Sequence, residues 1–528
     1  MNNFYDEIKP VLNKLRELNV FDSLDVVRKY VYSSIHKKGK DYIKGVENPH
    51  SYNIEIYYAD FLILNSIIYS SVVREKKSLS KAEIRNIICS PIVELQRRNN
   101  SNRMKAHPSI WVNSYFFNQV NMQPDGNEKI MLYRHFFMYN EPSVRMAIEY
   151  SLGFPLVNFF RMLFFLYACF ANTFCHPIEH LFMNNNSDED PDVKALKYIL
   201  SITSKPLSEL RELCKDNNRY DEDRIMSYYK DSPHVQFPLI SFEKKLYCVI
   251  PAYILYSAID ELYRILNKHN EVRENYSKKF EDYIGQIFNH YFFNTEIKFQ
   301  SEMKYKKGKH EKLTSDWIIW DETDICFIDC KIKKITISGQ RANSIDNEWI
   351  DKIIDEKPFS NSQINKISND MQESLTKDIF NLGIDLGKIF VCYDDYRNDK
   401  IEGFPYMSDK QFHACLLLLD QNFCNVDEIR NNIIRIAQGY RDYRTKIVTN
   451  IKEDEVLVIS SREMERYVPL IAKLGISKFV ELKLNGDIYK YEEDNVFLKD
   501  MCKSTFLDKL MIDINKRVEK MNGQKINV

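Results

Sequence analysis

The chain has 528 residues, more than one ordinary hydrophobic core supports, so two or three domains are expected. Hydrophobic residues make up 44% of it and charged residues 28%, a balance that excludes a largely disordered protein. The formal net charge of −1 excludes a polycation, so any nucleic-acid binding has to come from a local basic patch.

The 11 cysteines form no CxxC pair and no cluster with the spacing of zinc ligands. The first residues, MNNFYDEIKPVLNKL, mix charged and apolar side chains and contain no apolar signal core. Free thiols in such a chain indicate a reducing compartment, and we therefore expect a cytoplasmic protein.

Up to about residue 235 the pattern is helical. Apolar residues recur at spacings of three and four over 6–18 and 59–73, and residues 143–174 continue the pattern. The stretch 154–174 has the length of a membrane span, but Arg161 and several polar residues within it would be penalised in lipid. A buried helix explains this stretch better. Residues 1–235 are therefore predicted to form an α-helical domain that does not enter a membrane.

The pattern changes near residue 236, where short apolar runs bounded by polar residues begin. Helices are expected at 251–266, 278–293, 363–382 and 462–474, and strands at 237–240, 246–250, 297–305, 316–320, 325–335, 388–393, 412–419 and 456–460. A helix, three strands, a helix and a strand in succession are typical of an α/β domain. We predict an α+β multidomain protein with an α/β domain at 236–475 and a C-terminal strand–helix extension at 476–528.

Two carboxylates and a lysine occur in two of the predicted strands. Asp316 opens one apolar run, and thirteen residues later Asp329 stands two residues before Lys331 in another. Because side chains alternate along a strand, Asp329 and Lys331 project to the same face. Charged groups in such apolar runs are costly unless they pair with one another or bind an ion. The pattern therefore indicates either a structural ion pair or a cation site.

Phosphodiester hydrolysis needs this set of groups. Two carboxylates can hold Mg²⁺, which takes few protein ligands and keeps several waters. The metal polarises the phosphate and helps to generate hydroxide. A neighbouring lysine can orient or deprotonate the attacking water and offset negative charge in the transition state.

The segment resembles the PD-(D/E)xK nuclease superfamily, also called restriction-endonuclease-like, over about residues 275–395 and possibly to 475. Asp329-Cys330-Lys331 is similar to the (D/E)xK element, and Asp316 is similar to the first aspartate of the motif. Ser315 stands where the proline of that motif would be.

Two more positions are assigned through this resemblance. Members often carry a glutamate on the helix that precedes the sheet, and Glu281 is the candidate, with Asp282 as the alternative. Many members carry a glutamine on the helix after the lysine strand. Gln372 is similar to it, with Gln363 as the alternative, and Thr376 stands where a tyrosine is sometimes found.

The resemblance implies a domain with a mixed central sheet and a Mg²⁺-dependent nuclease in which Mn²⁺ can substitute, acting on DNA rather than RNA. Glu281, Asp316 and Asp329 would bind the metal, and Lys331 would assist the water. The helical N-terminal domain would restrain the enzyme, form a homo-oligomer or bind a regulatory protein. The architecture is similar to standalone bacterial anti-phage defence effectors. The alternative is a non-catalytic scaffold that binds nucleic acid or protein and retains the fold.

Lysines surround the motif and predict a nucleic-acid-binding patch whose affinity would fall steeply with salt. The candidates are Lys304, Lys306, Lys307 and Lys309 before Asp316, and Lys333 beyond Lys331. The alternative is an exposed hairpin with ordinary solvated lysines.

Residues 176–180, His176-Pro177-Ile178-Glu179-His180, match a pattern that some zinc peptidases carry on a helix. Proline is tolerated only in the first turn of a helix. We therefore interpret this match as a coincidence.

Overall fold

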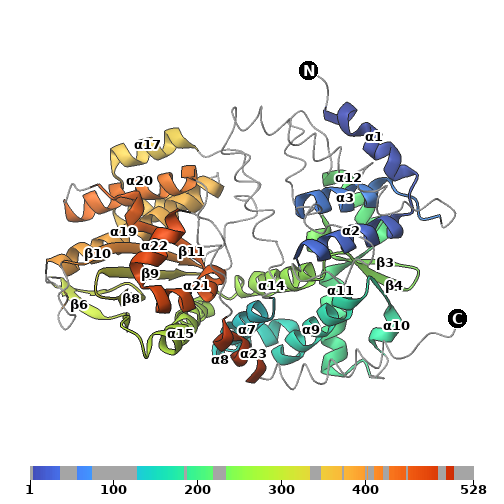
Figure 1. Cartoon of the computed structure of the whole chain (residues 1–528), viewed down its shortest axis with the longest axis horizontal. Helices are drawn as coiled ribbons and strands as arrows, with labels where there is room; N and C mark the ends of the chain where they lie inside the picture. Colours follow the sequence, from blue (N-terminus) through green and yellow to red (C-terminus); the bar gives the residue numbers. More distant parts are fainter. Residues whose placement is uncertain are drawn as a thin grey trace. The chain divides into compact units, whose positions relative to one another are not determined.

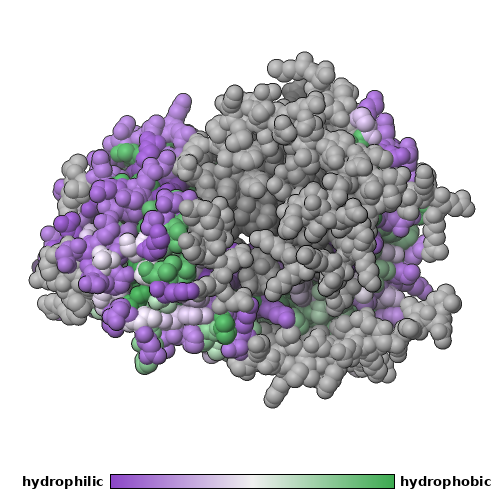
Figure 2. All heavy atoms as spheres, in the orientation of Figure 1, coloured by the Kyte–Doolittle hydropathy of each residue, from purple (hydrophilic) through white to green (hydrophobic). Residues whose placement is uncertain are grey.

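In the computed structural model the described part of the chain forms two compact units, one of residues up to 274 together with 501–504, the other of residues 275–500. The described residues are 4–35, 56–73, 128–182, 187–217, 233–307, 309–332, 346–370, 374–398, 401, 409–419, 427–446, 450–485 and 495–504. Figure 1 draws the helices and strands of both units. Over the second unit, the face drawn in Figure 2 is mostly hydrophilic with smaller hydrophobic areas.

The first unit is mainly helical. Its helices are α1 (Phe4–Arg16), α2 (Val20–Ile35), α3 (Ile56–Tyr69), α7 (Glu128–Tyr139), α8 (Pro142–Leu152), α9 (Leu156–Asn172), α10 (Ile178–Leu181), α11 (Pro191–Thr203), α12 (Leu207–Asn217), α13 (Pro233–Gln236) and α14 (Ala252–Leu266). The last helix of the described chain, α23 (Val496–Ser504), ends in this unit.

The first unit also contains a four-stranded sheet, in the order β1-β4-β3-β2. Its strands are β1 (Cys175–Pro177), β2 (Ser204–Pro206), β3 (Leu239–Phe242) and β4 (Lys245–Cys248). The all-helical prediction for residues 1–235 therefore needs correction at β1 and β2, which are too short to show an alternating pattern. Because β3 and β4 pair with these strands, the first unit extends to residue 274 and beyond the predicted boundary at 235.

The apolar stretch 154–174 forms α9, as predicted, and its large side chains, such as Phe159, Leu163 and Phe170, are buried. Among the described residues, no single helix has the length and apolarity to cross a membrane, although α8 and α9 meet that test as a pair bent by 71°.

The zinc-peptidase pattern does not lie on one helix. His176 is in β1, where its Nε2 is 3.0 Å from the carbonyl oxygen of Cys169, while His180 belongs to α10. Burial lowers the pKa of His176. This arrangement agrees with the interpretation of the pattern as a coincidence.

The second unit is built on a five-stranded mixed sheet in the order β11-β10-β9-β8-β5. The strands are β5 (Lys298–Ser301), β8 (Trp317–Trp320), β9 (Asp324–Lys331), β10 (Gln411–Leu418) and β11 (Val456–Ser460). β9, β10 and β11 are parallel, whereas β8 and β5 are added antiparallel, so the predicted mixed sheet is confirmed. A separate hairpin of β6 (Lys304–Lys307) and β7 (His310–Leu313) is inserted between β5 and β8.

Helices cover both faces of this sheet (Figure 1). They are α15 (Arg273–Phe292), α17 (Asn347–Glu356), α18 (Asn361–Asp370), α19 (Ser374–Arg397), α20 (Asp427–Thr445), α21 (Ser461–Leu474) and α22 (Ile476–Leu484). α19 and α20 share one hydrophobic core with alternate residues of β9, β10 and β11. α15 packs on the other face through the ring of Trp317.

Two predicted strands differ from the structure. Residues 388–393 lie inside α19, so that prediction is wrong, and the predicted helix at 363–382 is divided between α18 and α19. Periodicity cannot distinguish a short apolar helix segment from a strand, and Ile389 and Phe390 are buried on the helix. The predicted strand at 297–305 divides into β5 and β6, because the chain leaves the central sheet after Ser301.

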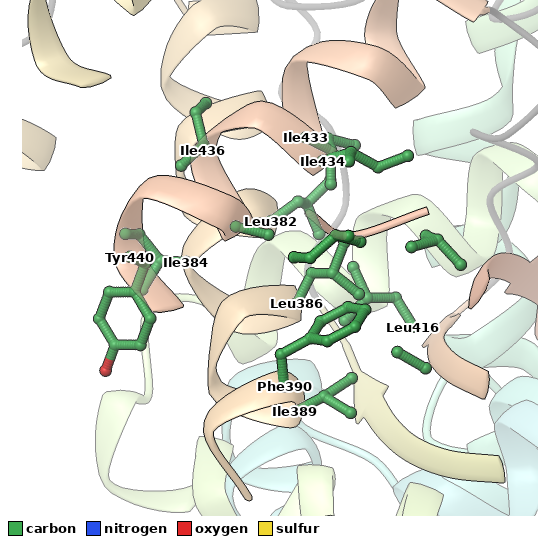
Figure 3. Packing of buried hydrophobic residues seen from close by; sticks show 14 of the residues in the cluster. Leu382, Ile384, Leu386, Ile389, Phe390, Leu416, Ile433, Ile434, Ile436 and Tyr440 are labelled. Atoms are coloured by element: carbon green, nitrogen blue, oxygen red, sulfur yellow. The ribbon is translucent and has the colours of Figure 1, made fainter. Parts of the chain in front are cut away.

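α19 lies at the centre of this core. Figure 3 shows Leu386 and Phe390 of α19 beside Leu416 of β10. On its other side α19 approaches α20 closely at Gly383, where a Cβ atom would lie 2.6 Å from the Ile436 side chain. The core therefore holds α19 in a fixed position over β9 and β10.

Candidate active site

Asp316 directly precedes β8 and stands opposite Asp329 of the antiparallel strand β9. The β8–β9 register pairs Trp317 with Ile328, and one further step pairs Asp316 with Asp329. Directly opposite residues in such a pair have Cβ atoms about 4.5–5.5 Å apart. The backbone N–H of Cys330 donates to Oδ2 of Asp316 at 2.6 Å, which fixes this carboxylate against β9. The strand pairing thus brings the two predicted carboxylates together.

Lys331 lies on the same face of β9 as Asp329, as the alternation predicts. Its Nζ donates to Oδ2 of Asp329 at 3.1 Å, and the two side chains are 21% and 12% exposed. Burial lowers the pKa of Lys331, but Asp329, Asp385 and Asp316 outweigh burial and raise this pKa above its ordinary value. Lys331 is therefore an ammonium group that solvent can reach.

A third carboxylate, Glu302, extends this arrangement to the strand on the other side. Its backbone N–H donates to the carbonyl oxygen of Asp316 at 2.9 Å, one step beyond the Ser301–Trp317 pair. Glu302, Asp316 and Asp329 therefore form a carboxylate row across three strands. Sequence reasoning missed Glu302 because residues 297–305 were predicted as one strand. The available signal was a charged residue that interrupts that run.

α15 carries Glu281 to the same end of the sheet. The indole N–H of Trp317 donates to the backbone oxygen of Glu281 at 3.2 Å. Gly285 allows this approach, since a Cβ there would lie 2.4 Å from the Trp317 ring. Asp282 is exposed and lies 3.5 Å from the ammonium of Lys279. Glu281, the preferred candidate, is therefore the acidic residue of α15 beside the carboxylate row.

Burial and neighbouring carboxylates raise the pKa values of Glu281 and Asp316. Burial, followed by the charges of Asp316 and Glu302, raises the pKa of Glu281 to about 8. Burial, followed by the charge of Asp329, raises the pKa of Asp316 to about 7. Lys331 opposes both shifts without cancelling them. Negative charge at this end of the sheet is thus only partly compensated, as is common at functional sites.

The chemistry of these donors fits Mg²⁺. This ion prefers oxygen ligands, keeps several waters and commonly uses one or two carboxylates, which Asp316 and Asp329 can supply with Glu281 nearby. Among the described residues, no group of three or more His, Cys, Asp and Glu side chains is arranged to hold a metal ion. The described carboxylates therefore form no closed metal cage.

The lysines of the hairpin divide between its two faces. Lys307 and Lys312 both donate to the carboxylate of Asp395 on α19, whose side chain is 2% exposed. The hydroxyl of Tyr305 donates to the same carboxylate at 3.0 Å. Lys307, predicted to bind nucleic acid, therefore anchors the hairpin to α19.

The other candidate lysines of the hairpin are exposed. Lys304 and Lys306 lie on the face opposite Lys307, and Lys309 lies in the turn. Lys304 is 3.3 Å from Glu311, and both side chains are more than half exposed. These three lysines can reach a bound polyanion.

Two predicted site residues, Lys333 and Gln372, lie outside the described residues. The alternative glutamine, Gln363, is exposed on α18, where its side-chain oxygen accepts from Ser360. No contact of Gln363 with the carboxylate row occurs among the hydrogen bonds of the described residues.

No family model, no curated protein and no solved structure matches this chain. The candidate site therefore stands on the sequence motif and on the geometry described above.

Proposed function

We propose that the second unit is a metal-dependent nuclease, with a restriction-endonuclease-like domain, that hydrolyses phosphodiester bonds in DNA rather than RNA. The observation that carries this proposal is the position of Asp316, bonded to the backbone of β9 next to Asp329, with Lys331 bonded to Asp329. An ion pair with a structural role would leave its carboxylates compensated. Here burial and the charge of Asp329 raise the pKa of Asp316, so a cation bound beside it would favour the ionised carboxylate.

The order of elements supports the domain assignment. α15, β5, β8 and β9 follow one another as the predicted helix and three strands, with β6–β7 inserted. α17, α18 and α19 come next, and β10 is the strand that follows them, because the strand predicted at 388–393 lies inside α19. β9 and β10 are parallel neighbours joined through α19. The candidate residues lie at the end of β9 and the start of β8, where the neighbouring chain segments leave the sheet.

The residues divide the chemistry between them. Mg²⁺, when bound, would polarise the phosphate and lower the pKa of a bound water. Asp316, Asp329 and Glu281 would hold it. Lys331, whose pKa is raised, would act as a cation that orients the attacking water and offsets charge on the phosphate. It is poorly suited to accept a proton.

The test is cleavage of supercoiled plasmid, linear duplex, single-stranded DNA and RNA by the full chain with Mg²⁺ or Mn²⁺. Asp329→Asn and Lys331→Ala are each expected to lower the rate by about 10²–10⁴-fold, as expected for loss of several kcal/mol of transition-state stabilisation. Asp282→Asn, a change of charge on the exposed side of α15, is the matched control and is expected to cleave at the normal rate.

Equal cleavage by the wild type and all variants would indicate a contaminant and exclude these residues. If no protein cleaves, titration calorimetry with Mg²⁺ decides between the nuclease and the scaffold. Binding lost in Asp329→Asn supports a metal site in an enzyme that needs activation, and no binding in any protein supports the scaffold.

A further inference from the structure

Lys278 is a basic residue of α15 that lies one helical turn before Glu281. Residues three apart share a face of a helix. This face is held on the sheet farther along α15, where Gly285 contacts the Trp317 ring and the ring of Phe288 lies 5.7 Å from it. Lys278 is exposed, one turn from the residue that brings α15 to the carboxylate row.

The charges that act on Glu302 agree with this position of Lys278. Burial and the charge of Asp329 raise the pKa of Glu302, and Lys278, Lys331 and Lys304 each oppose that rise. The three lysines belong to α15, β9 and β6. Cations from three separate elements therefore act on a carboxylate of the row.

We propose that Lys278 binds a backbone phosphate of the nucleic acid, and that the strand to be cut crosses the carboxylate row between Lys278 of α15 and Lys304 of β6. This inference rests on the proposed function and adds the path of the substrate to it. A cation at the centre would neutralise the carboxylates, while the two lysines would hold phosphates on either side of the reacting one.

The contact of Lys304 permits this role. Lys304 pairs with Glu311 at 3.3 Å, and their side chains are 68% and 61% exposed. Exposed pairs of this kind contribute about 0–1 kcal/mol, so a phosphate can replace Glu311 at little cost. The next residue along α15, Lys279, has the same charge but lies 3.5 Å from Asp282 on a different side of the helix. Lys279 is therefore a matched control for Lys278.

The experiment measures the affinity of the full chain for a fluorescent DNA duplex over a series of salt concentrations, with EDTA present to prevent cleavage. In Lys278→Ala, the slope of log Kobs against log salt is expected to fall in magnitude by about 0.9. If the variant and the wild type bind DNA equally at 1 M salt, the variant should then bind about eightfold more weakly than the wild type at 0.1 M salt. Lys278→Arg and Lys279→Ala are expected to keep the wild-type slope, and unchanged thermal unfolding shows that each variant is folded.

An unchanged slope in Lys278→Ala would overturn the inference, and so would an equal fall in Lys278→Ala and Lys279→Ala, which would indicate a general effect of charge. Cleavage by a wild type whose slope does not depend on Lys278 would contradict the inference alone. A slope that depends on Lys278, in a protein that cleaves nothing and binds no Mg²⁺, would support the phosphate contact and contradict the proposed nuclease.

Discussion

Strand β9 carries a buried carboxylate at each end, and the two ends differ in how their charge is compensated. At the start, Asp324 accepts from the ring of His413 at 2.7 Å and from the hydroxyl of Thr323 at 2.5 Å. Burial alone would raise the pKa of Asp324, but these bonds outweigh it and lower the pKa. At the other end, Asp316 faces Asp329 and its pKa is raised to about 7.

Asp324 and Asp316 have the same type of side chain, and burial by itself raises the pKa of each, so neither residue type nor the direction of the burial effect distinguishes them. Compensation does. A carboxylate whose partners lower its pKa contributes to stability, whereas a group of carboxylates that raise one another's pKa costs stability and is kept for another reason. The comparison predicts that substitutions at the two ends have different consequences.

The largest expected difference is in catalysis. Asp316→Asn removes a proposed metal ligand and should lower the rate of Mg²⁺-dependent cleavage by about 10²–10⁴-fold. Asp324→Asn should lower the thermal unfolding temperature, because it breaks a buried pair with His413, and should leave the rate unchanged for folded protein. This prediction is tested by the initial rates of Mg²⁺-dependent cleavage by the two variants and the wild type, measured below the unfolding temperature of both variants. An inactive but folded Asp324→Asn protein would contradict the distinction.

Substitution of one glycine near each end of β9 tests the same comparison. Gly285→Ala would place a Cβ 2.4 Å from Trp317 at the carboxylate-row end, so α15 must shift and carry Glu281 with it. Gly475→Ala acts near the Asp324 end, where Gly475 has φ +84° and its added Cβ would lie 3.3 Å from Asp321. Each should cost about 1–3 kcal/mol of stability. Only Gly285→Ala should also slow cleavage. Equal activity per folded molecule in both variants would contradict the placement of Glu281.

The ends should also respond oppositely to pH. Glu281 and Asp316 have folded pKa values of about 8 and about 7, above the ordinary 4.5 and 3.8, so the folded state retains protons that the unfolded chain has lost. Without metal, the free energy of unfolding should therefore fall as pH rises from the ordinary pKa values to the folded ones. Asp324, with a lowered pKa, gives stability that is present above pH 3.8 and lost as pH falls through its folded pKa.

Thermal unfolding in EDTA from pH 5 to 9 checks the expected fall in stability with rising pH that Glu281 and Asp316 cause. Glu281→Gln should flatten the profile, whereas Asp282→Asn should follow the wild type. Mg²⁺ should stabilise the protein more at the upper end of this range, because its ligands must be ionised. A wild-type profile that rises over this range would contradict the assigned direction of the shifts.

The smallest expected effects are on the free energy of unfolding, and they differ between two lysines of the β6–β7 hairpin. Lys307→Ala removes one of three donors to the buried carboxylate of Asp395 and should cost about 1 kcal/mol. Lys304→Ala removes an exposed pair and should change stability by less than about 0.5 kcal/mol. Urea unfolding measures both. A larger loss in Lys304→Ala would show that its pair with Glu311 is structural.

The sequence was most informative where a local pattern suffices. The spacing of Asp316, Asp329 and Lys331 on alternating strands predicted their approach, and the preference for Glu281 over Asp282 agrees with the contacts of α15. The strand predicted at 388–393 failed because an apolar run is compatible with a helix or a strand. Packing of α19 against α20 favours the helix for residues 388–393.

The sequence by itself therefore determined which residue types share a strand face, because alternation follows from backbone geometry alone. The tertiary structure decided which faces meet. Pairing of β5 with β8 added Glu302 to the carboxylate row, and the fold of the hairpin onto Asp395 separated Lys307 from Lys304. These outcomes depend on contacts between residues far apart in the chain. Their energies decide whether a buried charge is compensated, as at Asp324, or left to bind a ligand, as we propose for Asp316.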